Sequence, residues 1–233
     1  MLRLAACLSA LAGPALAEGV VTARYEDPTT RYAHGVLGDA VEWGALFMEG
    51  SSGKAVRVRL PQSRVFEDTG PRLFDVDGDG DNEVIVVETD IGRGARLSIY
   101  DTEGLVAAND FIGQTNRWLA PLGVGAADLD GDGVVEFAYV DRPHLAKRLL
   151  ILRRDGRELR LVAALDGVSN HRIGDSDIAG GIRDCGAGPE MIVATADWSD
   201  VVAVRFDGLS FASRVLATHQ GRQTFAAAMD CKI

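Results

Sequence analysis

The stretch DVDGDGDNE at residues 75–83 carries the strongest structural signal in this chain of 233 residues. A second copy, DLDGDGVVE, follows at residues 128–136. In both copies, acidic residues stand at positions 1, 3 and 5, and a Glu ends the run at position 9. A β-rich run follows each Glu, so each acidic stretch is predicted to be a loop between two strands. We call them the first and second acidic loops.

Clustered carboxylates of this kind repel one another unless a cation lies between them. Ca²⁺ is the predicted ion, because it accepts about six to eight oxygen ligands in irregular geometry, whereas Mg²⁺ demands a stricter octahedron. Gly80 and Gly133 allow the sharp turn that aims the ligands inward. An EF-hand is excluded, because its closing Glu would stand at position 12, where Val86 and Tyr139 are found. Two solvated acidic turns without an ion are the alternative.

The two predicted Ca²⁺ sites have these ligands: Asp75, Asp77, Asp79, Asp81 and Glu83 in the first loop, and Asp128, Asp130, Asp132, Val134 (through its carbonyl) and Glu136 in the second.

The acidic motif belongs to a longer repeat. Asp75 and Asp128 are 53 residues apart, and a shorter third copy, DCGAGPE, starts 56 residues further on at Asp184. Short β-rich runs alternate with turn residues along the chain, which is typical of an all-β fold. Because the chain begins late in one repeat and ends early in another, with Asp230 resembling Asp184, we expect the terminal strands to share a blade. The prediction is one domain over residues 18–233, a closed β-propeller of four or five blades, with an open stack or a sandwich as the alternative.

The first residues indicate export. Arg3, a short apolar run and Ala15-Leu16-Ala17 are typical of a signal peptide over residues 1–17, cleaved before Glu18. A lipoprotein box ending at Cys7 is the alternative. The expected location is periplasmic or secreted, and no later segment is long and apolar enough to predict a transmembrane helix.

The net charge limits the expected partners, and the cysteine content indicates whether a disulfide forms. The net charge is −10, and nucleic acid is not an expected partner because phosphates require a basic surface. After cleavage, Cys185 and Cys231 remain, and in an oxidising compartment they predict one disulfide, with two buried thiols as the alternative. Since Cys185 stands in the third copy, which lacks the middle acids, we hypothesise that the bridge replaces the ion there and fixes the C-terminus.

The tandem motif Asp-x-Asp-x-Asp-Gly-x-x-Glu between strands resembles the FG-GAP/VCBS repeats. That family includes the β-propeller of integrin α chains and many exported bacterial proteins. The resemblance covers most of residues 20–233, but its sharp motifs are the two acidic loops. It implies Ca²⁺ at the ligands named above and none in the third copy. Family members often have about seven blades, for which this chain is short.

Loops at the other end of a propeller's strands form an opposite face. Here they are rich in Arg, His, Asp and aromatic residues, which suit an anionic group, a sugar or a peptide. Recurrent Arg–Asp pairs that only hold blades together are the alternative. The candidate ligand face consists of Arg31, His34, Arg117, Trp118, Asp141, Arg142, His144, His171, Arg172 and Arg222.

Three functions remain open at this point. The first is an exported Ca²⁺-binding propeller that acts as a binding or scaffold module for a protein, peptide or glycan in the cell envelope. The second is a propeller hydrolase or lyase that uses Arg, His and Asp of the opposite face. The third is a purely structural protein stabilised by Ca²⁺. No established catalytic motif occurs in the sequence, so no catalytic residue is assigned.

Overall fold

The computed structural model describes residues 18–233, so the predicted signal peptide lies outside the described residues. The N-terminal strands are β1 (Val20–Thr29), β2 (Glu42–Gly50), β3 (Ala55–Arg59) and β4 (Arg64–Phe66). Next come β5 (Arg72–Phe74), β6 (Glu83–Asp90), β7 (Gly94–Asp101) and β8 (Gly104–Ala108). They are followed by β9 (Leu119–Ala127), β10 (Glu136–Asp141), β11 (Arg148–Asp155) and β12 (Glu158–Asp166). The last elements are β13 (Val168–Ser169), β14 (Gly181–Asp184), β15 (Pro189–Thr195), β16 (Asp200–Phe206), β17 (Phe211–Thr218) and the helix α1 (Arg222–Met229).

The strands form three similar antiparallel meanders. These are β5-β6-β7-β8, β9-β10-β11-β12 and β14-β15-β16-β17, in which each strand pairs with the next along the chain. At the N-terminal end, β2 lies between β1 and β3. In each meander the loop between the first two strands is one copy of the predicted repeat, so the placement of the acidic loops between strands is confirmed. The described chain is mostly β, with one short helix where an all-β fold was predicted.

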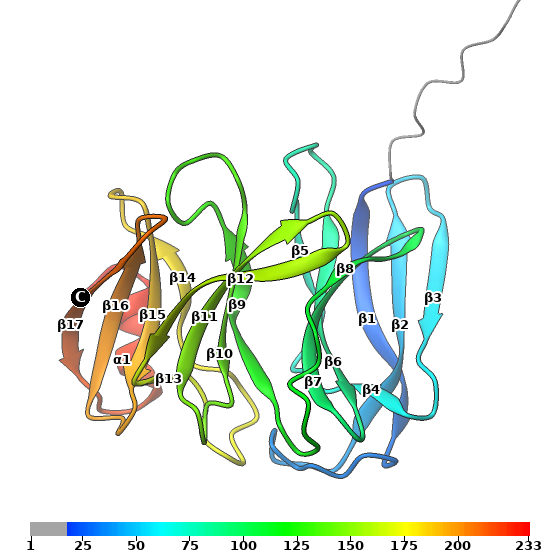
Figure 1. The fold of residues 1–233 in the computed structure, drawn as a ribbon, viewed down its shortest axis with the longest axis horizontal. Coiled ribbons are helices and arrows are strands. Elements are labelled where there is room, and N and C mark those ends of the chain that lie inside the picture. Colours follow the sequence, from blue (N-terminus) through cyan, green and yellow to red (C-terminus); the bar gives the residue numbers. More distant parts are fainter. Residues whose placement is uncertain (1–17) are drawn as a thin grey trace, which may run out of the picture.

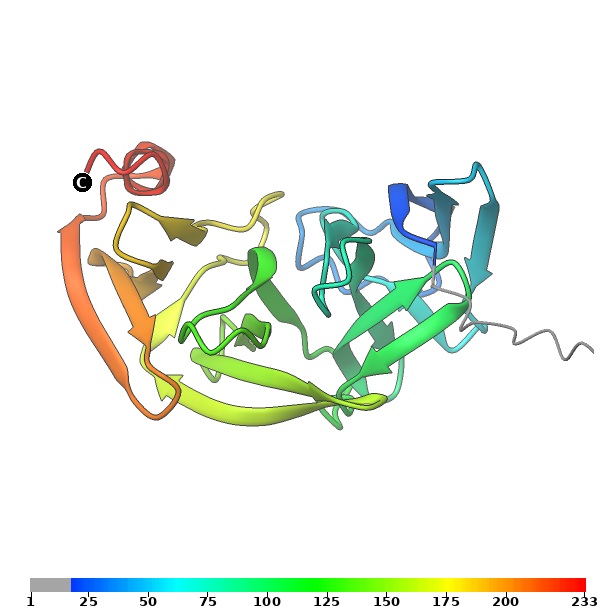
Figure 2. The same ribbon diagram turned by 90° about the horizontal axis from the view of Figure 1, so that it is seen from above.

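Neighbouring meanders are joined by very few backbone pairs. The short strand β4 connects β2 to β6, and β8 meets β12 in parallel through one residue pair. These links unite β1 to β12 into one 12-stranded sheet, while β13 to β17 form a separate sheet of five strands. Seen from above, the molecule is an open, curved array (Figure 2).

The expected closure of a ring by the two terminal strands is not formed. Within residues 18–233, β1 pairs only with β2 and β17 only with β16, and the two lie at opposite ends of the array (Figure 1). Each end strand pairs with its neighbour in the sequence, which is the favoured arrangement. The chain also ends in a helix, which buries Phe225 and Ala228 against the last sheet, so Asp230 does not begin a further repeat as expected.

The hydrophobic core lies between the meanders. The second strands β6 and β10 are buried along their whole length, and β15 is buried in its centre. The apolar runs at residues 84–87 and 137–140 are typical of strands that are buried on both faces. Phe137 and Ile151, both in the second meander, are 0 % exposed. Phe137 packs in the cluster shared with the first meander, and Ile151 packs in the cluster shared with the third. The cores therefore hold the loops at each end of the strands in fixed positions. Within the described part of the chain, no helix has the length and apolar character needed to cross a membrane.

Candidate functional site

The first acidic loop joins β5 to β6 and curls around its own carboxylates. The Asp75 carboxylate accepts the backbone N–H groups of Gly78 at 2.7 Å and Gly80 at 3.0 Å. The Glu83 carboxylate reaches back across the loop to accept the N–H of Val76 at 3.0 Å. Gly78 and Gly80 have φ values of 78° and 95°, which glycine adopts without steric cost. The glycines of the motif thus allow the loop to close on its acids.

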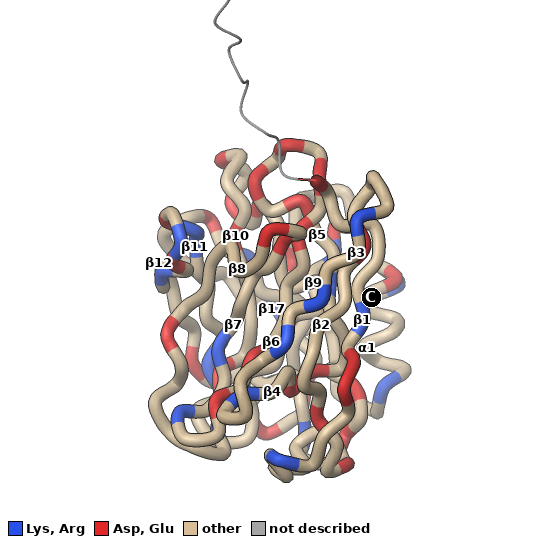
Figure 3. Tube along the Cα trace, turned by 90° about the vertical axis from the view of Figure 1, so that its right-hand side faces the viewer, with Lys and Arg blue, Asp and Glu red and all other residues tan. Residues whose placement is uncertain are grey.

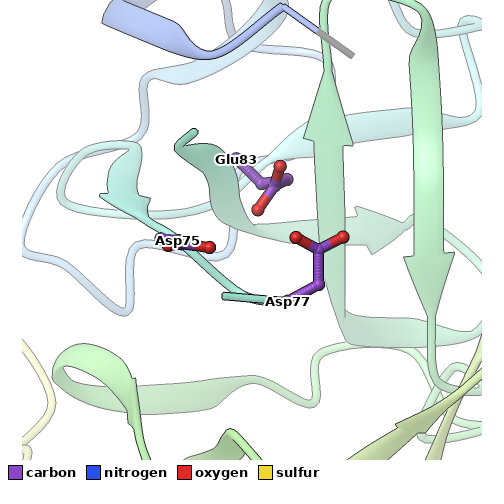
Figure 4. Close-up of side chains that lie close together, drawn as sticks. All are labelled: Asp75, Asp77 and Glu83. Atoms are coloured by element: carbon purple, nitrogen blue, oxygen red, sulfur yellow. The ribbon is translucent and has the colours of Figure 1, made fainter. Parts of the chain in front are cut away.

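Three carboxylates of this loop meet at one point (Figure 4). Asp75, Asp77 and Glu83 each place an oxygen within 4.8 Å of the others. Asp79 and Asp81 are not part of this group, and Asp79 instead accepts the N–H of Asp81 at 2.9 Å. Three of the five predicted ligands are therefore brought together. An all-oxygen group of this kind suits a hard divalent cation.

The charge balance of the first loop favours a cation. Glu83 is 5 % exposed, and its pKa is raised to about 7, chiefly by desolvation and also by the charges of Asp77, Asp79 and Asp75, although the hydrogen bond from Val76 N–H opposes the rise. Its charged form is therefore disfavoured unless a positive charge lies nearby. The one basic side chain recorded against these acids within residues 18–233 is Arg154, which lies 3.2 Å from Asp77 at the rim. Figure 3 shows the acidic segments that gather above β5 and β10 at this end of the molecule.

The second acidic loop, between β9 and β10, repeats this geometry. The Asp128 carboxylate accepts the N–H groups of the two loop glycines at 2.8 and 2.9 Å, and Glu136 accepts that of Leu129 at 2.7 Å. Asp128, Asp130 and Glu136 again place oxygens within 4.8 Å of one another. Val134 and Asp132 are not part of this group. Two loops that differ in sequence thus close in the same way.

The second loop differs from the first in having an arginine among its acids. The Arg153 guanidinium lies 2.7 Å from Asp130 and 2.9 Å from Asp132, and it also pairs with Glu136. Burial raises the pKa of Glu136, and Arg153 opposes that rise. Arg153 stands directly across the β10–β11 pair from Glu136. It therefore supplies positive charge at the place where an ion would bind.

The third loop, between β14 and β15, lacks the middle acids, and arginines of the strands surround its closing Glu. Its closing Glu190 pairs with Arg183 at 3.1 Å, Arg205 at 2.9 Å and Arg214 at 2.8 Å. Asp184 still organises the loop, because it accepts two glycine N–H groups at 2.7 and 3.1 Å. The closing Glu is thus retained in all three loops, at position 9 in the first two and at position 7 in the shorter third. Within the described residues it is bonded to no arginine, one arginine and three arginines in turn.

A disulfide joins Cys185 in the third loop to Cys231 just after α1, as predicted. Their Cα atoms are 5.7 Å apart. The Arg183 guanidinium reinforces this connection by donating to the backbone carbonyl of Ile233 at 2.9 Å. The C-terminus is therefore tied to the third loop by a covalent bond and by hydrogen bonds, although Cys231 follows a helix and not the strand of another repeat.

Half of the candidate ligand face converges on one cavity at the other end of the strands. This cavity, of about 290 Å³, is lined by His34, Arg117, Trp118, Arg142 and His144 among other residues. They come from three separate loops, which precede β2, β9 and β11.

The remaining members of the predicted face have local partners. Arg31 donates to the carbonyl of Arg64 at 3.0 Å, and the Arg172 guanidinium lies 4.3 Å from the centre of the Trp198 ring. Arg222 pairs with two aspartates of the loop after β13, at 2.7 and 2.8 Å. The four arginines of the predicted face that lie in the loops before β2, β9 and β14 and at the start of α1 (Arg31, Arg117, Arg172 and Arg222) therefore do not form one ring of charge.

Asp141 and His171 bond to residues of the cavity wall and are not part of that wall. Asp141 accepts three hydrogen bonds from the Arg142 guanidinium, at 2.7 to 3.1 Å. The rings of His144 and His171 share a hydrogen bond of 2.9 Å between Nε2 and Nδ1. Burial, followed by the charge of His171, lowers the pKa of His144 to about 4, so this imidazole is neutral near pH 7.

Several residues of these sites were missed from the sequence. Arg153 lies 17 residues after Glu136, in a strand, and nothing local marks it as a partner of the loop. The register of β10 on β11, with Glu136 opposite Arg153, is the signal that could have identified it. Glu67, which bonds to His34 at 2.5 Å, and Ile173, at the mouth of the cavity, also carry no motif.

No family model, no curated protein and no solved structure matches this chain. The resemblance to FG-GAP/VCBS repeats therefore rests on the residues of the two acidic loops and on their position between strands.

Proposed function

We propose that this protein is an exported Ca²⁺-binding module built from propeller-type repeats of the FG-GAP/VCBS kind. The observation that carries the proposal is the shared closure of the two acidic loops, each of which brings three carboxylates within 4.8 Å. Solvated acidic turns would have no reason to place like charges together twice in the same way. The three four-stranded meanders support the repeat assignment, since a blade of a propeller is a four-stranded antiparallel sheet.

Calcium fits these loops better than magnesium does. Each trio offers carboxylates on a short, curved segment, and neighbouring loop carbonyls and water supply the remaining oxygens of a flexible coordination shell. Neutral or thiolate ligands, which softer metals prefer, are not part of either trio. The ion would hold the loops closed at one end of β5, β6, β9 and β10, and would thereby stiffen the strands that carry the opposite face.

Export and a binding role complete the proposal. The disulfide between Cys185 and Cys231 supports an oxidising compartment, because such bonds persist outside the cytoplasm. The face opposite the acidic loops would contact a ligand or partner in the cell envelope, since the cavity and its Arg, His and Trp lining are at that end.

The test is Ca²⁺ titration of protein freed of metal by chelation, by calorimetry and by thermal unfolding. Two binding events are expected, with stabilisation of about 2.7 kcal/mol at a hundredfold excess over Kd for each site. Asp77→Asn should remove one event and Asp130→Asn the other, and the double variant should bind no ion. Mg²⁺ titrated in parallel should bind more weakly.

Asp110→Asn is the matched control, because it removes one exposed carboxylate outside both loops and should leave both events intact. If the metal-free protein takes up no Ca²⁺, or if the double variant binds it as the wild type does, the proposed function is wrong.

A further inference from the structure

We propose that the cavity on the opposite face is a binding site for a small organic carboxylate with an apolar body. The cavity measures about 290 Å³ and lies between loops that are far apart in the sequence, so the tertiary fold creates it. The inference rests on the proposed function only in treating the protein as a binding module, and the geometry involved does not include the acidic loops.

The topology places the cavity at the end of the strands away from the acidic loops. Strand β9 begins just after Trp118 and runs to the second acidic loop, and β10 leads from that loop back to Asp141. Strand β1 begins beside the first acidic loop, where Val20 N–H donates to the Asn82 carbonyl at 2.8 Å, and ends before His34. A ligand in the cavity would therefore not contact the predicted Ca²⁺ ligands.

The positive charge of the cavity comes from Arg117. Its guanidinium donates to the carbonyl of Asn116 at 2.8 Å, and no acidic partner for it is recorded within residues 18–233. The other charges are already compensated, since Asp141 holds Arg142 and the buried Glu67 bonds to His34. A guanidinium without an acidic partner among the described residues still offers two parallel N–H donors to a ligand, the geometry that a carboxylate accepts best.

The remaining walls are apolar or neutral. Trp118 is 2 % exposed and is fixed by its indole N–H, which donates to the carbonyl of Glu67 at 2.7 Å. Leu145 and Ile173 are 63 % and 72 % exposed at the edge of the cavity. Two large aliphatic side chains left in solvent beside a recess are more consistent with a ligand that covers them than with solvation alone.

The backbone holds this arrangement in a strained form. Asn116 and Arg142, both in the lining, have φ values of 53° and 44°, a region that residues with a side chain rarely adopt. Arg142 is fixed by the hydrogen bond from its N–H to the Trp118 carbonyl at 3.0 Å. Strain of this kind persists only where the surroundings impose it, and it concentrates at binding sites.

The volume limits the size of the ligand. A cavity of about 290 Å³ corresponds to roughly ten water molecules, so it accepts on the order of ten to fifteen non-hydrogen atoms. A carboxylate on a phenyl or branched aliphatic group fits this space. Such a group occurs both in free organic acids and at the C-terminus of a peptide that ends in an apolar residue.

The test uses 3-phenylpropionate against 3-phenylpropionamide, and N-acetyl-glycyl-phenylalanine against its C-terminal amide, on the Ca²⁺-loaded wild-type protein. Binding is followed by NMR shift perturbation and calorimetry. At least one acid should bind saturably, with a Kd at least tenfold lower than that of its amide. Preference for the phenylpropionate identifies a free acid as the source, and preference for the peptide acid identifies a C-terminus. Amides that bind as well as the acids, or no binding by either acid, would overturn the inference.

Variants decide whether the binding occurs in this cavity. Arg117→Gln should weaken acid binding at least tenfold, and Ile173→Glu should do the same by placing a negative charge at the mouth on a side chain too exposed to affect folding. Arg160→Gln, on the exposed surface of β12, is the matched control and should change nothing. Ca²⁺ affinity measured on the same samples separates the two proposals. Intact Ca²⁺ binding with equal acid affinity in the wild type and Arg117→Gln would sink this inference alone.

Discussion

The arginine among the acids of the second loop leads to a prediction about the relative affinity of the two proposed Ca²⁺ sites. Arg153 contacts Asp130 and Asp132 and pairs with Glu136, so it would compete with an ion for the same oxygens. In the first repeat, Val84 pairs with Tyr100, so the same register assigns Asp101 to the position that corresponds to Arg153. We therefore predict that the first loop binds Ca²⁺ more tightly, and that Arg153→Gln strengthens the second.

The size of the effect follows from the distances. A guanidinium that touches two carboxylates at 2.7 and 2.9 Å would stand about 5 Å from an ion held by the same groups. Repulsion between one and two unit charges at that distance is about 2 kcal/mol in water and up to about 7 kcal/mol at an effective dielectric constant near 20. The Arg153 side chain is 30 % exposed, so the lower figure applies. About 2 kcal/mol corresponds to roughly a 30-fold change in Kd.

The assay is Ca²⁺ calorimetry in single-site backgrounds. With Asp77→Asn present, calorimetry measures Ca²⁺ binding to the second loop only. Adding Arg153→Gln should lower the Kd of that loop for Ca²⁺ by roughly 30-fold. With Asp130→Asn present, Asp101→Arg should raise the Kd of the first loop by a similar factor. Arg160→Gln is again the control. An unchanged or higher Kd after removal of Arg153 would refute the reasoning, because the arginine would then support the site and not compete for it.

Three further predictions concern stability. Burial, followed by neighbouring carboxylates, raises the pKa of Glu42 to about 9, so the folded state binds the Glu42 proton more tightly than the unfolded state does. The free energy of unfolding should therefore fall as pH rises from about 4.5 to 9. In urea unfolding across this pH range, Glu42→Gln should flatten the slope and stabilise the protein by about 2–3 kcal/mol at pH 7. Replacing Cys185 and Cys231 by Ser should cost about 2–4 kcal/mol, because the bridge closes a loop with a sequence separation of 46, and an equal melting temperature for both forms would contradict this. Phe137→Ala should cost about 3–5 kcal/mol in chemical denaturation, against less than about 1 kcal/mol for Leu161→Ala, since the two side chains are 0 % and 57 % exposed.

Local sequence patterns predicted the features that depend on neighbouring residues. Each acidic loop is defined by features within a few residues of one another: the spacing of the acids, the glycines between them and the β-rich run after Glu83 or Glu136. The hydrogen bonds that close each loop also join residues that are close in the sequence. The cysteine pairing was also accessible, because only Cys185 and Cys231 remain after the predicted leader. These features needed no knowledge of which strands pack together.

The failed prediction of a closed ring has a different origin. The resemblance between the two ends of the chain suggested that they share a blade, but β1 and β17 each find a partner in the adjacent strand. Helix α1 then covers the last sheet. Sequence similarity between repeats indicates equivalent positions, whereas pairing depends on which backbone groups are still free after the local hairpins have formed.

The sequence by itself determined the strands, the turns and the two acidic loops, because each is set by propensity and spacing over about ten residues. The tertiary structure alone decided that Arg153 faces Glu136, and that Arg117, with no acidic partner among the described residues, lies beside Trp118 and Ile173 in one cavity. These side chains come from separate strands and loops, so their distances follow from strand register and from the packing of one meander on the next. A contact between distant parts of a chain leaves no local period in its sequence, and that is why only the three-dimensional structure could show which residues of the predicted face converge on one cavity.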